Sequence, residues 1–213
     1  MVRPFCFGTL VRIRAVMELD AEQDLLDEAE PAGESFVGAL ATVLTHLASV
    51  AGKPQRATRF HSVRPPQMSI HEYLARISKY FQCSSECFVL CLVYIDRIVK
   101  LHPEFTICSL NIHRLLVTAV MLAVKFFDDV YYSNAYYAKV GGVKLKEVNT
   151  LEAQFLQLID WRLHVTPQEY SQYRNHVFTA VHGGVTSGAV SALPAEMDAD
   201  GEGDVPMDLL EDA

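Results

Sequence analysis

The chain has 213 residues, half of them hydrophobic, and a formal net charge of −8. This length and composition are typical of one globular domain with a substantial core, and they exclude a chain that is disordered throughout. No uncharged apolar segment reaches the roughly 18 residues that a membrane-spanning helix needs, so we expect no membrane partner.

The negative charge is concentrated near the C-terminal end. Residues 183–213 contain eight acidic side chains and neither lysine nor arginine, which predicts a disordered acidic tail. The other 18 of the 26 acidic residues balance the 18 lysines and arginines of the chain. A nucleic-acid-binding surface requires an excess of basic side chains, so this neutral remainder predicts no nucleic-acid partner.

Residues 1–33 are predicted to be a disordered leader, first mixed in charge and then acidic. Its arginines between apolar residues resemble a transit peptide, but few serines accompany them. We therefore interpret residues 1–16 as an extension from a translation start upstream of Met17. Five cysteines, an odd number, without a secretory signal predict free thiols in a reducing compartment.

An N-terminal helix is predicted over residues 34–53, where apolar residues follow helical spacing and a Gly-Lys-Pro sequence ends the pattern. The block at 54–182 shows no sustained strand alternation, and its helix-breaking residues divide it into further helices. These are expected over residues 69–81, 84–101, 109–128, 134–140, 145–161 and 169–181. The second and third of them are apolar nearly all round, which predicts an all-α domain with these two at its centre.

Several helix ends have recognisable signals. Ser84 is the predicted N-cap of the helix over 84–101, and either Ser109 or Asn111 begins the next helix. Gly141 and Gly142 end the short helix over 134–140.

Two charged residues lie where the helical pattern predicts hydrophobic ones. Lys125 is the only charged residue in the apolar run 115–127, and Glu152 lies in the middle of the apolar arc of the helix over 145–161. Burying an unpaired charge is strongly unfavourable. Either the two residues form a buried ion pair, or Lys125 extends to the surface, or both charges line a groove that binds the backbone of a partner.

Three successive segments resemble the signatures of a cyclin box, namely VYIDR at 93–97, LAVKFFDD at 122–129 and LEAQFLQLIDW at 151–161. The segment YYSNAYYAKVGG at 131–142 is more particular. It resembles the plant P-type (also called U-type) cyclins, relatives of the fungal phosphate-pathway cyclin. The resemblance covers about residues 35–182. It implies a single cyclin box of five main helices within 54–182, with an extra N-terminal helix and a short C-terminal helix.

This resemblance implies a regulatory subunit, without an active site of its own, that binds and activates a cyclin-dependent protein kinase in cell-cycle or phosphate-signalling control. It implies a place in the nucleus, the cytoplasm or both. Lys125 and Glu152 match the pair with which cyclins hold the kinase near its C-helix, a contact that completes the ion pair of the kinase active site. The apolar residues expected at or just beneath this contact are Phe126, Leu151, Phe155, Leu156 and Trp161.

The chain departs from the two-box mitotic cyclins in its first box helix. Those cyclins recruit substrates through a Met-Arg-Ala-Ile-Leu-type motif, whereas this chain has Gln-Met-Ser-Ile at 67–70. We therefore do not expect substrate docking at that patch. The arginine of the motif is also the usual partner of the aspartate at position 96, and Arg76 is the nearest candidate to pair with Asp96 here.

Other chemistries find little support. No nucleophile elbow, glycine-rich phosphate loop or HExxH motif is present, so we expect no catalytic residues, no cofactor and no small-molecule substrate. Cys83, Cys87 and Cys91 share one helical face but match no common zinc pattern, which favours core packing over a metal site. The alternative function is a cyclin-fold adaptor in transcription that binds nucleic acid or transcription proteins, and it would need a basic face.

Overall fold

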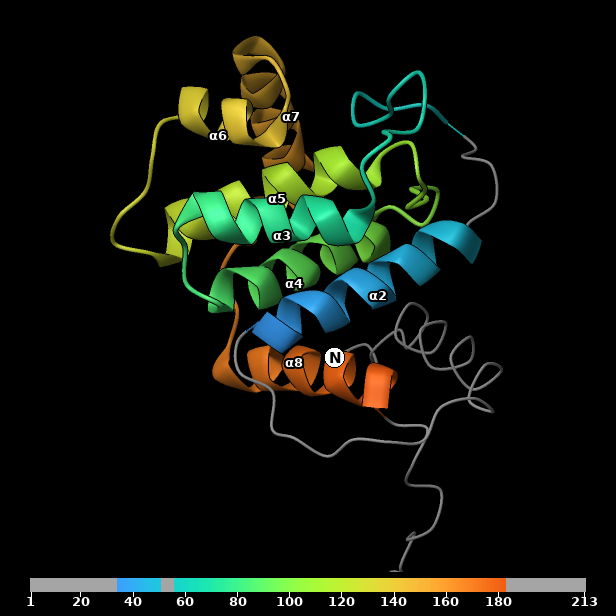
Figure 1. Ribbon diagram of the computed structural model, residues 1–213, viewed down its shortest axis with the longest axis vertical. Coiled ribbons are helices and arrows are strands. Elements are labelled where there is room, and N and C mark those ends of the chain that lie inside the picture. The colour runs from blue at the N-terminus through green and yellow to red at the C-terminus, as the bar shows by residue number, and fades with distance from the viewer. Residues whose placement is uncertain (1–33, 51–55, 183–213) are drawn as a thin grey trace, which may run out of the picture.

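The computed structural model describes residues 34–50 and 56–182. This part contains seven helices and no strand, which confirms the predicted all-α class (Figure 1). The helices are α2 (Glu34–Val50), α3 (Ile70–Phe81), α4 (Glu86–Leu101), α5 (Ile112–Phe127), α6 (Asn134–Gly141), α7 (Leu145–Leu158) and α8 (Pro167–His182). None of these helices is both long and apolar enough to span a membrane. The predicted leader and tail lie outside the described residues.

Helices α4 and α5 form the centre of the molecule, as predicted. All residues from 87 to 96 in α4 and from 115 to 124 in α5 are buried. The two helices pack against each other, while α3 and α7 cover α5 and α8 covers α4. Because neighbours surround them on several sides, both helices require apolar side chains around most of their circumference.

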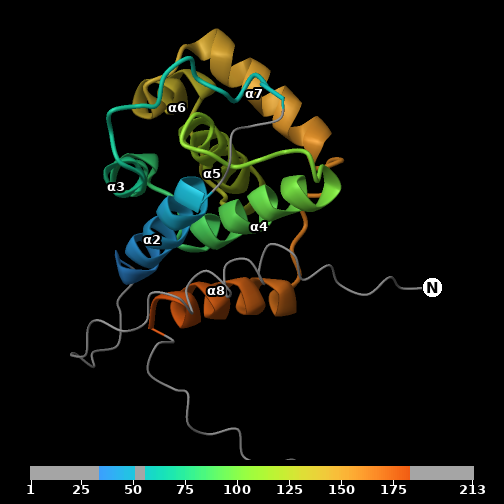
Figure 2. The same ribbon diagram turned by 90° about the vertical axis from the view of Figure 1, so that its right-hand side faces the viewer.

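The outer helices lie at opposite ends of this central pair. Helices α6 and α7 lie at one end and α8 at the other, with α4 and α5 between them in both views (Figures 1 and 2). Helix α2 packs on α3 and α8, and the rings of Phe36 and Phe178 meet edge to face with their centroids 5.5 Å apart. The N-terminal helix is therefore part of the folded domain.

Helix α3 begins and helix α6 ends within one residue of the predicted limits. The Ser69 hydroxyl accepts the Glu72 N–H at 3.2 Å, and the Glu72 carboxylate accepts the Ser69 N–H at 2.9 Å, which completes a capping box. At the end of α6, Gly142 takes a left-handed conformation with φ of 68°. The preceding Gly141 has a different role, since a Cβ there would lie 2.5 Å from Cγ2 of Val117.

The prediction that Ser84 caps α4 is wrong. Helix α4 begins at Glu86, after Ser85, which makes no side-chain capping bond. Ser84 instead donates its hydroxyl to Oδ1 of Asp128 at 2.6 Å and its N–H to Oδ2 at 3.0 Å. An ionised carboxylate is a stronger acceptor than a neutral group. These two bonds tie the segment before α4 to the end of α5.

The pairing of Asp96 also differs from the prediction. Asp96 is buried, and its carboxylate contacts Nζ of Lys100 at 2.6 Å and accepts the hydroxyl of Tyr173. Arg76 points elsewhere and donates to the carbonyl of Lys139 at 3.4 Å. Lys100 lies one turn along the same helix as Asp96, so it reaches the carboxylate without help from a neighbouring helix.

The three cysteines around the start of α4 are packing residues, as predicted. Cys87 and Cys91 are buried and Cys83 is partly buried. Burial raises the pKa of the Cys91 thiol, which keeps it neutral at physiological pH. In residues 34–50 and 56–182, no group of three or more His, Cys, Asp and Glu side chains is placed to hold a metal ion.

Candidate functional site

Lys125 lies in the last turn of α5, where this buried helix reaches the surface. Val124 before it is buried, whereas Phe126 after it is 51% exposed. The helix ends at Asp128, whose N–H donates to the carbonyl of Val124 at 3.0 Å and whose carboxylate is held by Ser84. The backbone that carries Lys125 is therefore anchored to the start of α4.

Lys125 and Glu152 form an ion pair between α5 and α7. The Nζ atom of Lys125 donates to Oε1 of Glu152 at 2.7 Å. The two side chains are 24% and 20% exposed, respectively. Of the alternatives that the sequence left open, the structure shows the two residues paired with each other, with both side chains still in contact with solvent. Partial exposure lowers the desolvation penalty that a fully buried pair would carry.

A third residue, Asn134, joins the pair and was missed by the sequence analysis as a site residue. Its Oδ1 accepts Nζ of Lys125 at 2.5 Å, and its Nδ2 donates to Oε2 of Glu152 at 2.7 Å. The same Nδ2 donates to Oδ1 of Asn149 at 2.8 Å. We refer to Lys125, Asn134 and Glu152 as the polar ring. It links the end of α5, the start of α6 and the middle of α7.

The side chain of Ser133 sets the start of α6, and with it the position of Asn134. Ser133 has extended backbone geometry, and its hydroxyl accepts the N–H of Tyr136 at 3.4 Å. Asn134 is thereby the first helical residue and faces α5 and α7 across the polar ring.

The predicted apolar neighbours fall into two groups. Phe126 is 51% exposed, Trp161 is 67% exposed and Leu156 is partly buried. Leu151 and Phe155 are buried in the core beneath them. Only the first three therefore present side-chain surface to a partner, and the other two support α7 from below.

Trp161 is exposed because α7 ends before it, whereas the sequence predicted a helix as far as residue 161. The helix stops at Leu158, and Asp160 and Trp161 have φ of 53° and 58°, in the left-handed region. A left-handed conformation is unusual for a bulky residue such as tryptophan. The reversal carries the indole out of the apolar arc of α7 and leaves it on the surface.

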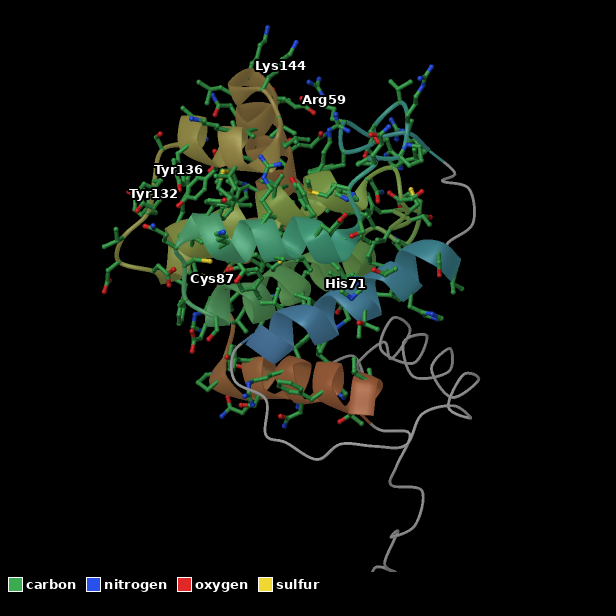
Figure 3. The ribbon with its side chains drawn as sticks, viewed as in Figure 1. Arg59, His71, Cys87, Tyr132, Tyr136 and Lys144 are labelled. Carbon is green, nitrogen blue, oxygen red and sulfur yellow. The ribbon has the colours of Figure 1, made fainter. Side chains whose placement is uncertain are left out.

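Further exposed apolar side chains continue from the end of α5 towards α6, and the sequence analysis did not single them out. Tyr132 stacks on Tyr136 with ring centroids 4.5 Å apart, and the two lie at one edge of the molecule (Figure 3). Contiguous exposed apolar surface is typical of interaction sites. The additional exposed residues are Phe127, Val130, Tyr131 and Tyr132.

Comparison with known proteins gives one family match and several relatives of the same family. Residues 18–163 match the cyclin family. Cyclin-U4-1 of Arabidopsis thaliana is 48% identical over 128 residues, an alignment that covers 60% of this chain and 63% of that relative. Cyclin-U1-1 of the same plant is 39% identical over 170 residues, covering 74% of this chain and 81% of the relative. Cyclin-P4-1 of Oryza sativa subsp. japonica is 45% identical over 114 residues, covering 54% of each chain.

These alignments confirm the resemblance to the plant P-type or U-type cyclins that the sequence indicated. The alignment with Cyclin-U4-1 spans less than two thirds of that relative, whereas the family match extends over more than half of this chain. The family match also includes both charged residues of the polar ring, the loop before α6 and Trp161. Cyclins are regulatory proteins and not enzymes. This chain belongs to the cyclin family and is a cyclin of the plant P or U type.

Proposed function

We propose that this cyclin is a regulatory subunit that binds and activates a cyclin-dependent protein kinase through the surface around the polar ring. The observation that carries the proposal is the partly exposed ion pair of Lys125 and Glu152, flanked by the exposed side chains of Phe126 and Trp161. The process that it serves is the control of cell division or of phosphate signalling, in the nucleus, the cytoplasm or both.

The polar ring has hydrogen-bonding capacity left for a partner. A lysine ammonium has three donors, and Lys125 uses two of them on Asn134 and Glu152. The Glu152 carboxylate accepts one bond on each oxygen, whereas each oxygen has room for two. A kinase backbone carbonyl would take the remaining donor, and a backbone N–H would take a remaining acceptor site. Recognition of main-chain groups requires this combination of one donor and one acceptor.

The expected consequence lies in the kinase. A cyclin held at the kinase C-helix favours the inward position of that helix, in which its glutamate pairs with the lysine that binds the phosphates. This chain contributes position only, and the chemistry of phosphoryl transfer belongs to the kinase.

Co-purification with a cyclin-dependent kinase tests the proposal. The wild-type chain is expected to retain the kinase and to raise its activity on a histone substrate. The double variant Lys125→Ala, Glu152→Ala is expected to lose retention of the kinase while its circular dichroism spectrum stays unchanged.

A matched control is available on the same two helices. Arg114 of α5 and Glu147 of α7 form a second ion pair of 2.5 Å with similar exposure. The variant Arg114→Ala, Glu147→Ala removes equal charge and is expected to bind the kinase normally. Equal loss of kinase in both double variants, or normal retention in the first, would contradict the proposal.

A further inference from the structure

Six basic side chains of the described residues make no ion pair or side-chain hydrogen bond with another described residue. They come from the loop before α3, from α6 and from the first residues of α7. Figure 3 shows two of them, Arg59 and Lys144, at the end of the molecule where α7 lies. By contrast, Arg97, Arg114, Lys125 and Arg162 are each paired with a carboxylate. The six residues are Arg56, Arg59, Arg64, Lys139, Lys144 and Lys146.

Two of these side chains, Arg59 and Lys146, line an open groove of about 860 Å³ along the outer face of α7. We refer to it as the basic groove. Its lining contains no Asp or Glu. The two acidic residues of α7 are engaged elsewhere, because Glu147 pairs with Arg114 and Glu152 with Lys125. The positive charge of the groove is therefore not compensated by α7 itself.

The remaining lining suits an extended peptide. Asn149, Gln154 and Gln157 present amide groups, which match backbone N–H and C=O groups. The Oε1 atom of Gln154 is buried and has no hydrogen-bond partner among the described residues. Leu145 is 46% exposed and adds an apolar contact. Binding of single-stranded nucleic acid relies on aromatic side chains for base stacking, and the groove lining has none.

The basic groove adjoins the polar ring. Asn149 lines the groove and also accepts a hydrogen bond from Asn134. A protein held in the groove would lie beside the surface that we propose for the kinase. The chain's own acidic residues at 183–213 follow α8, which lies at the opposite end of the molecule from α7 (Figure 1). A segment of another protein reaches the groove without crossing the domain.

We infer that the basic groove binds an extended acidic segment of a second protein, with a leucine-like side chain against Leu145. Carboxylates of the segment pair with Arg59 and Lys146, and the amides of Gln154 and Gln157 bind its backbone. This binding site is separate from the polar ring and does not depend on a kinase being bound.

Fluorescence anisotropy of the full chain with a labelled ten-residue peptide tests the inference. The probe has four glutamates around a central leucine, and the control peptide has glutamines in place of the glutamates. The glutamate peptide is expected to bind, and the glutamine peptide is not. The variant Arg59→Glu, Lys146→Glu is expected to weaken its binding by tenfold or more, and salt is expected to weaken binding to the wild-type chain.

A charge-matched variant serves as the control. Lys79→Glu, Arg174→Glu reverses two exposed cations that lie on α3 and α8, away from the groove. This variant is expected to bind the glutamate peptide as the wild type does. Equal weakening in both variants would show a general charge effect and overturn the inference. The inference would also be overturned if a twelve-base single-stranded DNA bound at the same residues more tightly than the glutamate peptide does. Peptide binding that appears only after the acids of residues 183–213 are neutralised would identify the chain's own acidic segment as the occupant. That outcome would also overturn the inference.

Discussion

At the scale of single residues, Asn134 explains how two opposite, partly exposed charges are held in a defined geometry. An ion pair at the surface is ordinarily weak, because two long side chains lose freedom when they are fixed. Here the Asn134 amide accepts from Lys125 on one side and donates to Glu152 on the other. Both charged groups are thereby oriented before a partner arrives, which reduces the ordering cost of binding.

We expect Asn134→Ala to lower the free energy of unfolding by about 1 kcal/mol, because hydrogen bonds to two charged groups are lost while water still reaches them. Asn134→Asp is expected to cost more, since it places a carboxylate beside Glu152. Urea denaturation measures both values. A variant with alanine that is as stable as the wild type would show that the amide does not fix the pair.

His113 is expected to make the fold sensitive to mild acid. Its Nε2 lies 2.8 Å from the carbonyl of Met68, and its ring packs on Tyr73 with centroids 4.8 Å apart. Burial lowers the pKa of His113 below its ordinary value of 6.5, and burial lowers the pKa of His61 as well. The unfolded chain therefore binds protons more readily than the folded chain, so stability is lost as the pH falls below about 6.5.

Urea denaturation at pH 7.5 and pH 5.5 tests this. The wild type is expected to be less stable at the lower pH, and His113→Gln, which keeps a donor for Met68, is expected to show a smaller difference. An unchanged difference in the variant would remove His113 as the cause.

At the scale of helices, the ends of the elements decide where the site residues lie. Gly141 ends α6 in close contact with α5, where a Cβ would lie 2.5 Å from Cγ2 of Val117. The short helix that carries Asn134 is thereby packed directly on the helix that carries Lys125. The left-handed residues after α7 have the opposite effect on Trp161, which they turn out to solvent.

Gly141→Ala is expected to destabilise the fold by about 1–3 kcal/mol through overpacking against Val117. Gly38, within α2, serves as the control, because a Cβ added there would have no neighbouring heavy atom within 4 Å. Gly38→Ala is expected to stabilise by about 0.5–1 kcal/mol through helix propensity. Thermal denaturation measures both variants: the melting temperature is expected to fall for Gly141→Ala and to rise for Gly38→Ala. Equal shifts of the melting temperature in the two variants would contradict the packing argument.

Periodicity predicted the helices and their anomalies, but not contacts between elements. Lys125 and Glu152 were recognisable because each interrupts an apolar pattern. Asn134 was not, since a polar residue at a helix start is ordinary. The proposed pair of Arg76 and Asp96 was wrong because Lys100, on the same helix, and Tyr173 of α8 bind the carboxylate instead. The exposure of Trp161 depends on backbone angles that the hydrophobic pattern does not encode.

At the scale of the whole molecule, the two surfaces described lie at the same end and have different chemistry. The polar ring pairs charges and leaves donors and acceptors for a kinase backbone, with apolar side chains beside it. The basic groove has uncompensated positive charge. The overall neutrality of residues 1–182 conceals this second surface, because the balancing acids lie elsewhere in the chain. Asn149 connects the two surfaces.

Exchange of the two charges separates kinase docking from folding. In Lys125→Glu, Glu152→Lys the ion pair persists, and rotation of the Asn134 amide by about 180° restores its hydrogen bonds to both charged groups. The bond between Asn134 and Asn149 is kept if the Asn149 amide rotates as well. The stability in urea is therefore expected to stay close to that of the wild type. The groups offered to the kinase backbone are inverted, and co-purification with a cyclin-dependent kinase is expected to be lost. A stable exchanged variant that retains the kinase would contradict the docking role of Lys125 and Glu152.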